Sequence, residues 1–120
     1  MKFVGYKLQG KTEKAGLDMI EDAKLLESSG CFSIVLEKIP TNLAKQITEI
    51  ISIPTIGIGA GPHCDGQILV LHDMIGLFEN FTPKFVKKYA HIGDEIRKAV
   101  QQYKQEVKEG VYPDKKHSFE

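Results

Sequence analysis

The sequence predicts an α/β fold, with about three parallel strands in one sheet and helices covering them. Segments with the apolar period of a helix alternate along the chain with short apolar runs rich in Ile and Val. These runs are nearly continuous in hydrophobicity, which is typical of parallel strands that are buried on both faces. No internal repeat, low-complexity tract or linker interrupts the 120 residues, so the sequence predicts one domain.

The first expected helix follows an irregular segment, residues 1–10. It begins after the capping residue Thr12 and ends at Gly30, a residue type that readily takes the left-handed conformation of a helix end. Its apolar residues recur at spacings of three and four and predict one buried stripe: Ala15, Met19, Ile20, Ala23 and Leu26. The run Cys31–Leu36 is then expected to form a strand covered on both faces, which Glu37 ends.

A short helix and two further strands are expected next. Pro40 and Thr41 are residue types found at helix starts. The apolar face of this helix is expected at Leu43, Ala44, Ile47 and Ile50. Ile53–Gly61 is expected to form a buried strand that runs into a glycine-rich turn, and Ile68–Leu71 a third strand.

Two helices are expected in the C-terminal third. Thr82 and Pro83 would begin the first, with Phe85, Val86, Tyr89 and Ala90 on its apolar face. The second has helical spacing of Ile92, Ile96, Ala99, Val100, Tyr103 and Val107. It is expected to end at Gly110, and residues 111–120 are expected to be irregular. Because three strands leave two open edges, strands this apolar also predict neighbouring strands beside them.

Composition argues against several classes of function. Sixteen Lys and Arg balance sixteen Asp and Glu, which disfavours binding to nucleic acid or to anionic lipid. No apolar run approaches the ~20 residues of a membrane span, and no secretory signal follows Met1. We therefore expect a cytoplasmic protein with no nucleic-acid partner and no membrane. Cys31 and Cys64 have neither C-x-x-C nor zinc spacing and are expected to be small buried side chains.

Glu37 is the residue that most clearly indicates chemistry. A carboxylate directly after a buried strand lies where α/β enzymes place catalytic groups, at the carboxyl ends of strands. There it can act as a general base. The alternative is a glutamate that ends the strand and pairs with Lys38 or with solvent.

Three other motifs leave alternatives open. Gly57–Gly61 has Pro62 where a G-x-G-x-x-G loop needs glycine, so it predicts either a close backbone approach to a ligand or chain segment, or a tight turn. A polar cluster could suggest a metal site, but its spacing fits no standard zinc signature, so structural roles are favoured: His63, Cys64, Asp65, His72 and Asp73. A small basic patch is expected to be a solvated helix face: Lys84, Lys87 and Lys88.

The ordered strings Leu36–Pro40, Ile56–Gly61 and Asp65–Asp73 together closely resemble the ketopantoate hydroxymethyltransferase family. Gly5–Gly10 is similar to the loop that precedes this part in the family, and Gly110–Pro113 with His117–Phe119 is similar to its C-terminal segment. The resemblance therefore covers essentially the whole chain.

This resemblance implies a (β/α)8 TIM barrel. Because such a barrel takes about 250 residues, residues 1–120 would be its C-terminal half, with the N-terminal half absent. The implied activity is transfer of a one-carbon unit from 5,10-methylenetetrahydrofolate to 3-methyl-2-oxobutanoate, giving 2-dehydropantoate in pantothenate biosynthesis. The glutamate of the matched motif is the family's base, which implies that Glu37 is the catalytic proton acceptor.

The resemblance also implies Mg²⁺, which holds the keto acid and stabilises its enolate in the complete enzyme. No segment matches the family's metal ligands, its substrate-contacting serine or its substrate-binding lysine, so we expect no metal ligand in this chain and no turnover by it alone. Expected partners are the substrate and either further copies in a homo-oligomer or the N-terminal half. Two alternatives stay open: a non-catalytic half-barrel interaction module, and a small phosphate-binding α/β module that uses Gly57–Gly61.

Overall fold

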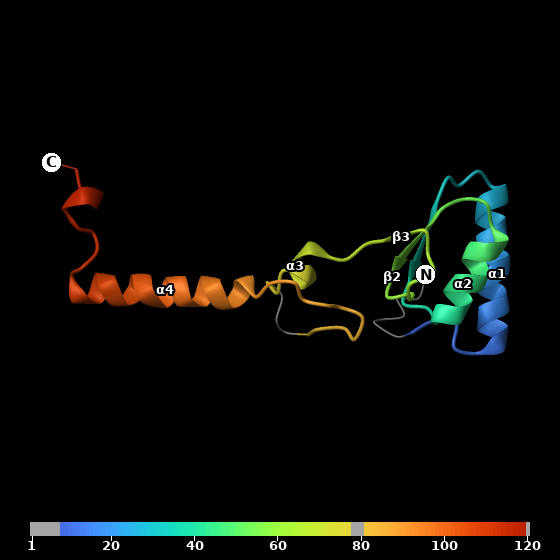
Figure 1. Cartoon of the computed structure of the whole chain (residues 1–120), viewed down its shortest axis with the longest axis horizontal. Helices are drawn as coiled ribbons and strands as arrows, with labels where there is room; N and C mark the ends of the chain where they lie inside the picture. The colour runs from blue at the N-terminus through green and yellow to red at the C-terminus, as the bar shows by residue number, and fades with distance from the viewer. Residues whose placement is uncertain (1–7, 78–80, 120) are drawn as a thin grey trace. The chain divides into compact units, whose positions relative to one another are not determined.

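The computed structural model describes residues 8–77 and 81–119 (Figure 1). The chain divides into two compact units, Met1–Leu69 and Val70–Glu120. The boundary falls inside the apolar run Ile68–Leu71, where the sequence has no linker composition. Of the expected loop segment Gly5–Gly10, residues 5–7 lie outside the described residues, and residues 8–10 are in no helix or strand.

The first unit contains a parallel sheet with two helices, which confirms the α/β class. Its elements are α1 (Glu13–Ser28), β1 (Ile34–Glu37), α2 (Thr41–Ile50), β2 (Thr55–Ile58) and β3 (Gly66–Gln67). The three strands lie in the order β1-β2-β3 and all pairs are parallel. The sheet is open, and no closed barrel is formed by these strands.

Helix α1 begins where the sequence predicts. The Thr12 hydroxyl accepts a hydrogen bond from the Ala15 N–H at 3.2 Å, and Gly30 follows the helix end at φ +93°. The predicted stripe is only partly buried, because Ala23 lies in the core whereas Leu26 is 43% exposed. The helix therefore covers the sheet with a narrower face than its apolar spacing suggests.

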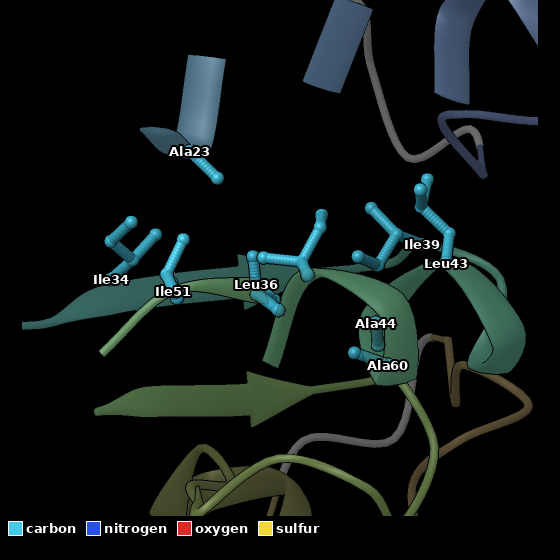
Figure 2. Close-up of a cluster of buried hydrophobic side chains, with 9 residues drawn as sticks. Ala23, Ile34, Leu36, Ile39, Leu43, Ala44, Ile51 and Ala60 are labelled. Carbon is cyan, nitrogen blue, oxygen red and sulfur yellow. The ribbon is translucent and has the colours of Figure 1, made fainter. Parts of the chain in front are cut away.

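The core lies between the two helices and one face of the sheet (Figure 2). It consists of Ala23, Ile34, Leu36, Ile39, Leu43, Ala44, Ile47, Ile51 and Ala60. Ile34 and Leu36 of β1 are buried in it, whereas Val35 between them is 55% exposed. The expectation that β1 is covered on both faces is therefore wrong for this chain, since only its helix-facing side is covered. On α2, Ile50 is likewise exposed rather than part of the buried face.

The third strand is displaced from its predicted position. It consists of Gly66–Gln67 rather than Ile68–Leu71. The last hydrogen bond between this segment and β2 is donated by the Ile68 N–H to the Gly57 carbonyl oxygen. Its neighbour β2 stops at Ile58, so the residues that follow have no ladder to extend.

The second unit is helical and irregular. It contains α3 (Leu71–Met74), α4 (Ile92–Glu109) and a short 3₁₀ helix, Lys115–His117, in the tail that was expected to be irregular. The helix expected from Thr82 is absent between residues 81 and 91. The N–H groups of Tyr89 and Ile92 instead donate to the carbonyl oxygens of Met74 and Ile75, so contacts with the α3 segment replace helical hydrogen bonds. Lys84, Lys87 and Lys88 are therefore not on a helix face.

Helix α4 ends at Gly110, which takes φ +70°, as the sequence predicts. Its apolar stripe is exposed along its length, with Val100 at 59% and Tyr103 at 58%. Among the described residues, no helix is both long enough and apolar enough to cross a membrane.

Candidate functional site

Glu37 is the last residue of β1 and is exposed. Successive side chains on a strand point to opposite faces, and Ile34 and Leu36 point into the core. Val35 and Glu37 therefore share the other face, which the described helices leave uncovered. The structure thus places the predicted carboxylate at the carboxyl end of a parallel strand, with Ile58 of β2 as its register neighbour.

An apolar hollow of about 300 Å³ runs along the side of β1. Its walls come from α1, β1 and α2 and are mainly apolar: Met19, Ala23, Leu26, Ile34, Val35, Leu36, Ile39 and Ile47. Asp22 and Glu37 are the charged residues among its lining. Glu37 therefore stands where an apolar surface meets the carboxyl end of the sheet.

The backbone turns sharply directly after Glu37. Lys38 has φ +50°, its N–H donates to the Ile58 carbonyl oxygen at 2.9 Å, and its carbonyl oxygen accepts from the Gln9 N–H at 2.9 Å. The sequence does not predict this turn, because lysine is not a residue type that favours a left-handed conformation.

The glycine run after β2 packs against the chain itself. Gly61 has φ +79°, and a Cβ there would lie 2.8 Å from the Cβ of Thr41 at the start of α2. The Gly61 carbonyl oxygen also accepts from Gln67 Nε2 at 2.9 Å. Of the alternatives that the sequence left open, the close approach to another chain segment is therefore the one observed.

In the part of the chain that the structure describes, no three possible metal ligands come together, and this holds for the polar cluster His63, Cys64, Asp65, His72 and Asp73. The Asp65 carboxylate accepts the Thr55 N–H at 2.8 Å and the Thr55 hydroxyl at 3.2 Å, so it clamps the start of β2. Cys64 packs half-buried against the core, and Cys31 is also half-buried, and neither forms a disulfide.

Thr55 is part of a polar network that the sequence analysis missed. Its side chain is 0% exposed and lies 2.8 Å from the Thr48 hydroxyl, which in turn donates to the Ala44 carbonyl oxygen of α2. The network therefore ties β2, α2 and Asp65 together. The available signal was a threonine inside an apolar strand with an aspartate ten residues later, which is too common a pattern to indicate a contact.

Magnesium, which the sequence resemblance implies, does not fit the residues that the structure describes. In residues 8–77 and 81–119, no three His, Cys, Asp or Glu side chains come together as a possible metal site. No chemical step is therefore assigned to a metal held by these residues.

The sequence profile of a family described as ketopantoate hydroxymethyltransferase matches residues 1–115. The chain belongs to this family. It is 62% identical over 117 residues to the 3-methyl-2-oxobutanoate hydroxymethyltransferase of Clostridium kluyveri, and 56% identical over 118 residues to that of Syntrophobacter fumaroxidans. A protein of the same name from Syntrophus aciditrophicus is 58% identical over 118 residues.

These matches cover 98% of this chain but only 42% to 43% of each relative. The chain therefore spans less than half of the length of the hydroxymethyltransferases that it matches. This agrees with the open sheet and with the uncovered face that carries Glu37.

Proposed function

We propose that this chain is the C-terminal part of a (β/α)8 barrel and supplies the general base for hydroxymethyl transfer to 3-methyl-2-oxobutanoate. The position of Glu37 carries the proposal, because barrel enzymes place catalytic groups at the carboxyl ends of their strands. Membership of the ketopantoate hydroxymethyltransferase family supports it, as do the names of the relatives.

In the proposed reaction, the Glu37 carboxylate removes the proton from the carbon beside the keto group. The C–H electron pair moves into the enolate, which attacks the one-carbon unit of 5,10-methylenetetrahydrofolate. A new C–C bond forms to the methylene carbon while its two C–N bonds to the folate break, and water supplies the hydroxyl group of the product, 2-dehydropantoate. The proton removed from the keto acid and the second proton of water go to the two folate nitrogens, so tetrahydrofolate leaves. Stabilisation of the enolate oxygen is assigned to groups outside the described residues, since these hold no metal-binding cluster.

The rest of the barrel would dock on the free side of β1. The N–H groups of Ile34 and Lys38 donate toward β2, so the alternating geometry of a parallel strand directs those of Val35 and Glu37 to the opposite edge. Within the described residues, β1 pairs with β2 alone. The apolar hollow beside this edge gives an incoming strand and helix a surface to bury.

Reconstitution tests the proposal. The chain is mixed or co-expressed with the remaining N-terminal portion of the Clostridium kluyveri relative, and formation of 2-dehydropantoate is measured. We expect no product from either part alone and turnover from the mixture. In the mixture, Glu37→Gln should reduce kcat by roughly 10² to 10⁴-fold, the usual contribution of a general base.

Glu49→Gln on α2 is the matched control. Glu49 is an exposed glutamate that lies 3.8 Å from Lys45, so the same substitution there should leave turnover unchanged. Full activity of the Glu37→Gln mixture would refute the assigned role. A stable complex without any turnover would favour the non-catalytic interaction module, and the mass of that complex would show whether the edge is filled by the N-terminal portion or by a second copy.

A further inference from the structure

The backbone of Lys38 is in a conformation that lysine rarely adopts. Its φ of +50° is the only positive value among the described residues other than glycine. In this region the Cβ of an L-residue approaches the carbonyl oxygen, so the conformation is unfavourable for most residues other than glycine, and asparagine tolerates it better than lysine. Such outliers persist only where surrounding contacts hold them, and they concentrate at functional sites.

The left-handed residue changes which face the following side chain occupies. In an uninterrupted strand, Glu37 and Ile39 would lie on the same face, because residues two apart share a face. Instead Glu37 is exposed on the uncovered face whereas Ile39 is 5% exposed and belongs to the core. The left-handed conformation of Lys38 therefore allows the Glu37 carboxylate to face outward while the Ile39 side chain packs in the core.

The turn is fixed from both sides by backbone hydrogen bonds. The Lys38 N–H donates to the carbonyl oxygen of Ile58, the last residue of β2, and the Lys38 carbonyl oxygen accepts from Gln9, which precedes α1. Pro40 follows two residues later and begins α2, which restricts the chain further. The backbone that follows Glu37 is thus held by one hydrogen bond to the end of β2 and by a second to Gln9.

We propose that Lys38 is a positioning residue, whose left-handed backbone fixes the Glu37 carboxylate on the open face at the end of β1. The inference rests on the proposed function, since it assigns to Lys38 the orientation of the proposed base. The proposal assigns this role to the backbone conformation of Lys38. A base that is held in one orientation loses rate when it is loosened, because small displacements of a reacting group reduce turnover strongly.

Four substitutions separate the backbone from the side chain. Lys38→Gly and Lys38→Asn remove the ammonium group and accept a positive φ more readily than lysine, Lys38→Ala removes the ammonium group and keeps an unbranched Cβ, and Lys38→Val is β-branched and opposes a positive φ. In the reconstituted mixture we expect the Gly, Asn and Ala variants to keep kcat within about threefold of the original chain. Lys38→Val should lower kcat by about 10- to 100-fold with little change in KM.

Two results would overturn the inference. One is an unchanged kcat in Lys38→Val. The other is an equal loss in Gly, Asn and Val variants, which would assign the role to the ammonium group. Unchanged pH dependence of kcat/KM across the active variants is also expected, because a positioning residue moves the base without replacing it.

A measurement on the chain by itself keeps the inference testable if Lys38→Val folds poorly or the mixture is inactive. NMR of the 120-residue chain reports the φ of residue 38 through its amide coupling constant, and relaxation reports the mobility of the Glu37 side chain. Lys38→Thr, which is β-branched like valine but polar, should increase Glu37 mobility whereas Lys38→Asn should not, with the Ile47 methyl signals of the core unshifted in both. Equal Glu37 mobility in all variants would contradict the inference, whereas an inactive mixture of original sequences would contradict only the proposed function.

Discussion

Removal of the Asp65 carboxylate should weaken the start of β2. The substitution Asp65→Ala takes away the acceptor of the Thr55 N–H at 2.8 Å and of the Thr55 hydroxyl at 3.2 Å. Thr55 is fully buried, so its N–H loses a charged partner in a position that water reaches poorly. The Thr55 hydroxyl keeps the Thr48 hydroxyl as a partner at 2.8 Å, so the Thr55 N–H is the group that loses its hydrogen bond to Asp65.

The expected magnitude follows from this single bond. A hydrogen bond to a charged group contributes about 1.5 to 3 kcal/mol, and the exposed position of Asp65 lets water compensate in part, so we expect about 2 kcal/mol. Amide hydrogen exchange at Thr55 measures this directly, and exchange through unfolding should become about 30-fold faster. Urea denaturation followed by circular dichroism gives the same quantity for the cooperative unit.

Asp18→Ala on the exposed side of α1 is the matched control, with an expected change of less than about 0.5 kcal/mol. The reasoning fails if Asp65→Ala exchanges at the same rate as the original chain, or loses no more stability than Asp18→Ala. A divalent cation that stabilises the original chain but not Asp65→Ala would also refute it, because Asp65 would then act as a ligand rather than as a strand clamp.

Two further predictions concern the core and the C-terminal turn. Ile47→Ala should cost about 2 to 5 kcal/mol because Ile47 is 1% exposed, whereas Ile50→Ala on the same helix, at 46% exposure, should cost far less; equal shifts in urea midpoint would contradict the assigned core. The hydrogen bond from the His117 ring lowers the pKa of Asp114 below its ordinary 3.8, so the stabilisation by this pair is present at neutral pH and is lost as pH falls through the lowered pKa. His117→Ala should raise the pKa of Asp114 toward 3.8 in an NMR titration, and an unmoved pKa would show that the other contacts of Asp114 hold it low.

The sequence predicted those elements whose ends are set by local chemistry. Thr12 caps α1, Gly110 ends α4 in the left-handed conformation, and Glu37 closes β1. These signals depend on a few neighbouring residues, so they survive in any tertiary context. The position of the candidate base was therefore predictable, although its environment was not.

Elements that depend on distant partners were predicted less well. The segment after Thr82 has a helix-start pattern, yet Tyr89 donates its N–H to Met74, fifteen residues earlier. The run from Ile68 has strand composition, yet its neighbour β2 has already ended at Ile58. In both cases a tertiary contact, or the lack of one, decides the structure, and local propensity does not contain that information.

The uncovered face of the sheet was not predicted for a different reason. Apolar composition shows that β1 is suited to burial on two sides, and the Val35 side chain is suited to a partner that the described residues do not provide. Composition therefore describes the environment for which a strand is suited, whereas the structure shows how much of that environment this chain provides.

The open edge of β1 should affect how much of the chain accumulates in a cell. Within residues 8–77 and 81–119, β1 has no strand on the side away from β2, and the N–H and C=O groups of this edge are a template on which an extended polypeptide can add a strand. Chaperones and proteases recognise such surfaces, so the abundance of the chain should depend on how quickly the edge is occupied after synthesis. The strand that carries Glu37 would then also limit how long the chain persists before a partner strand pairs with it.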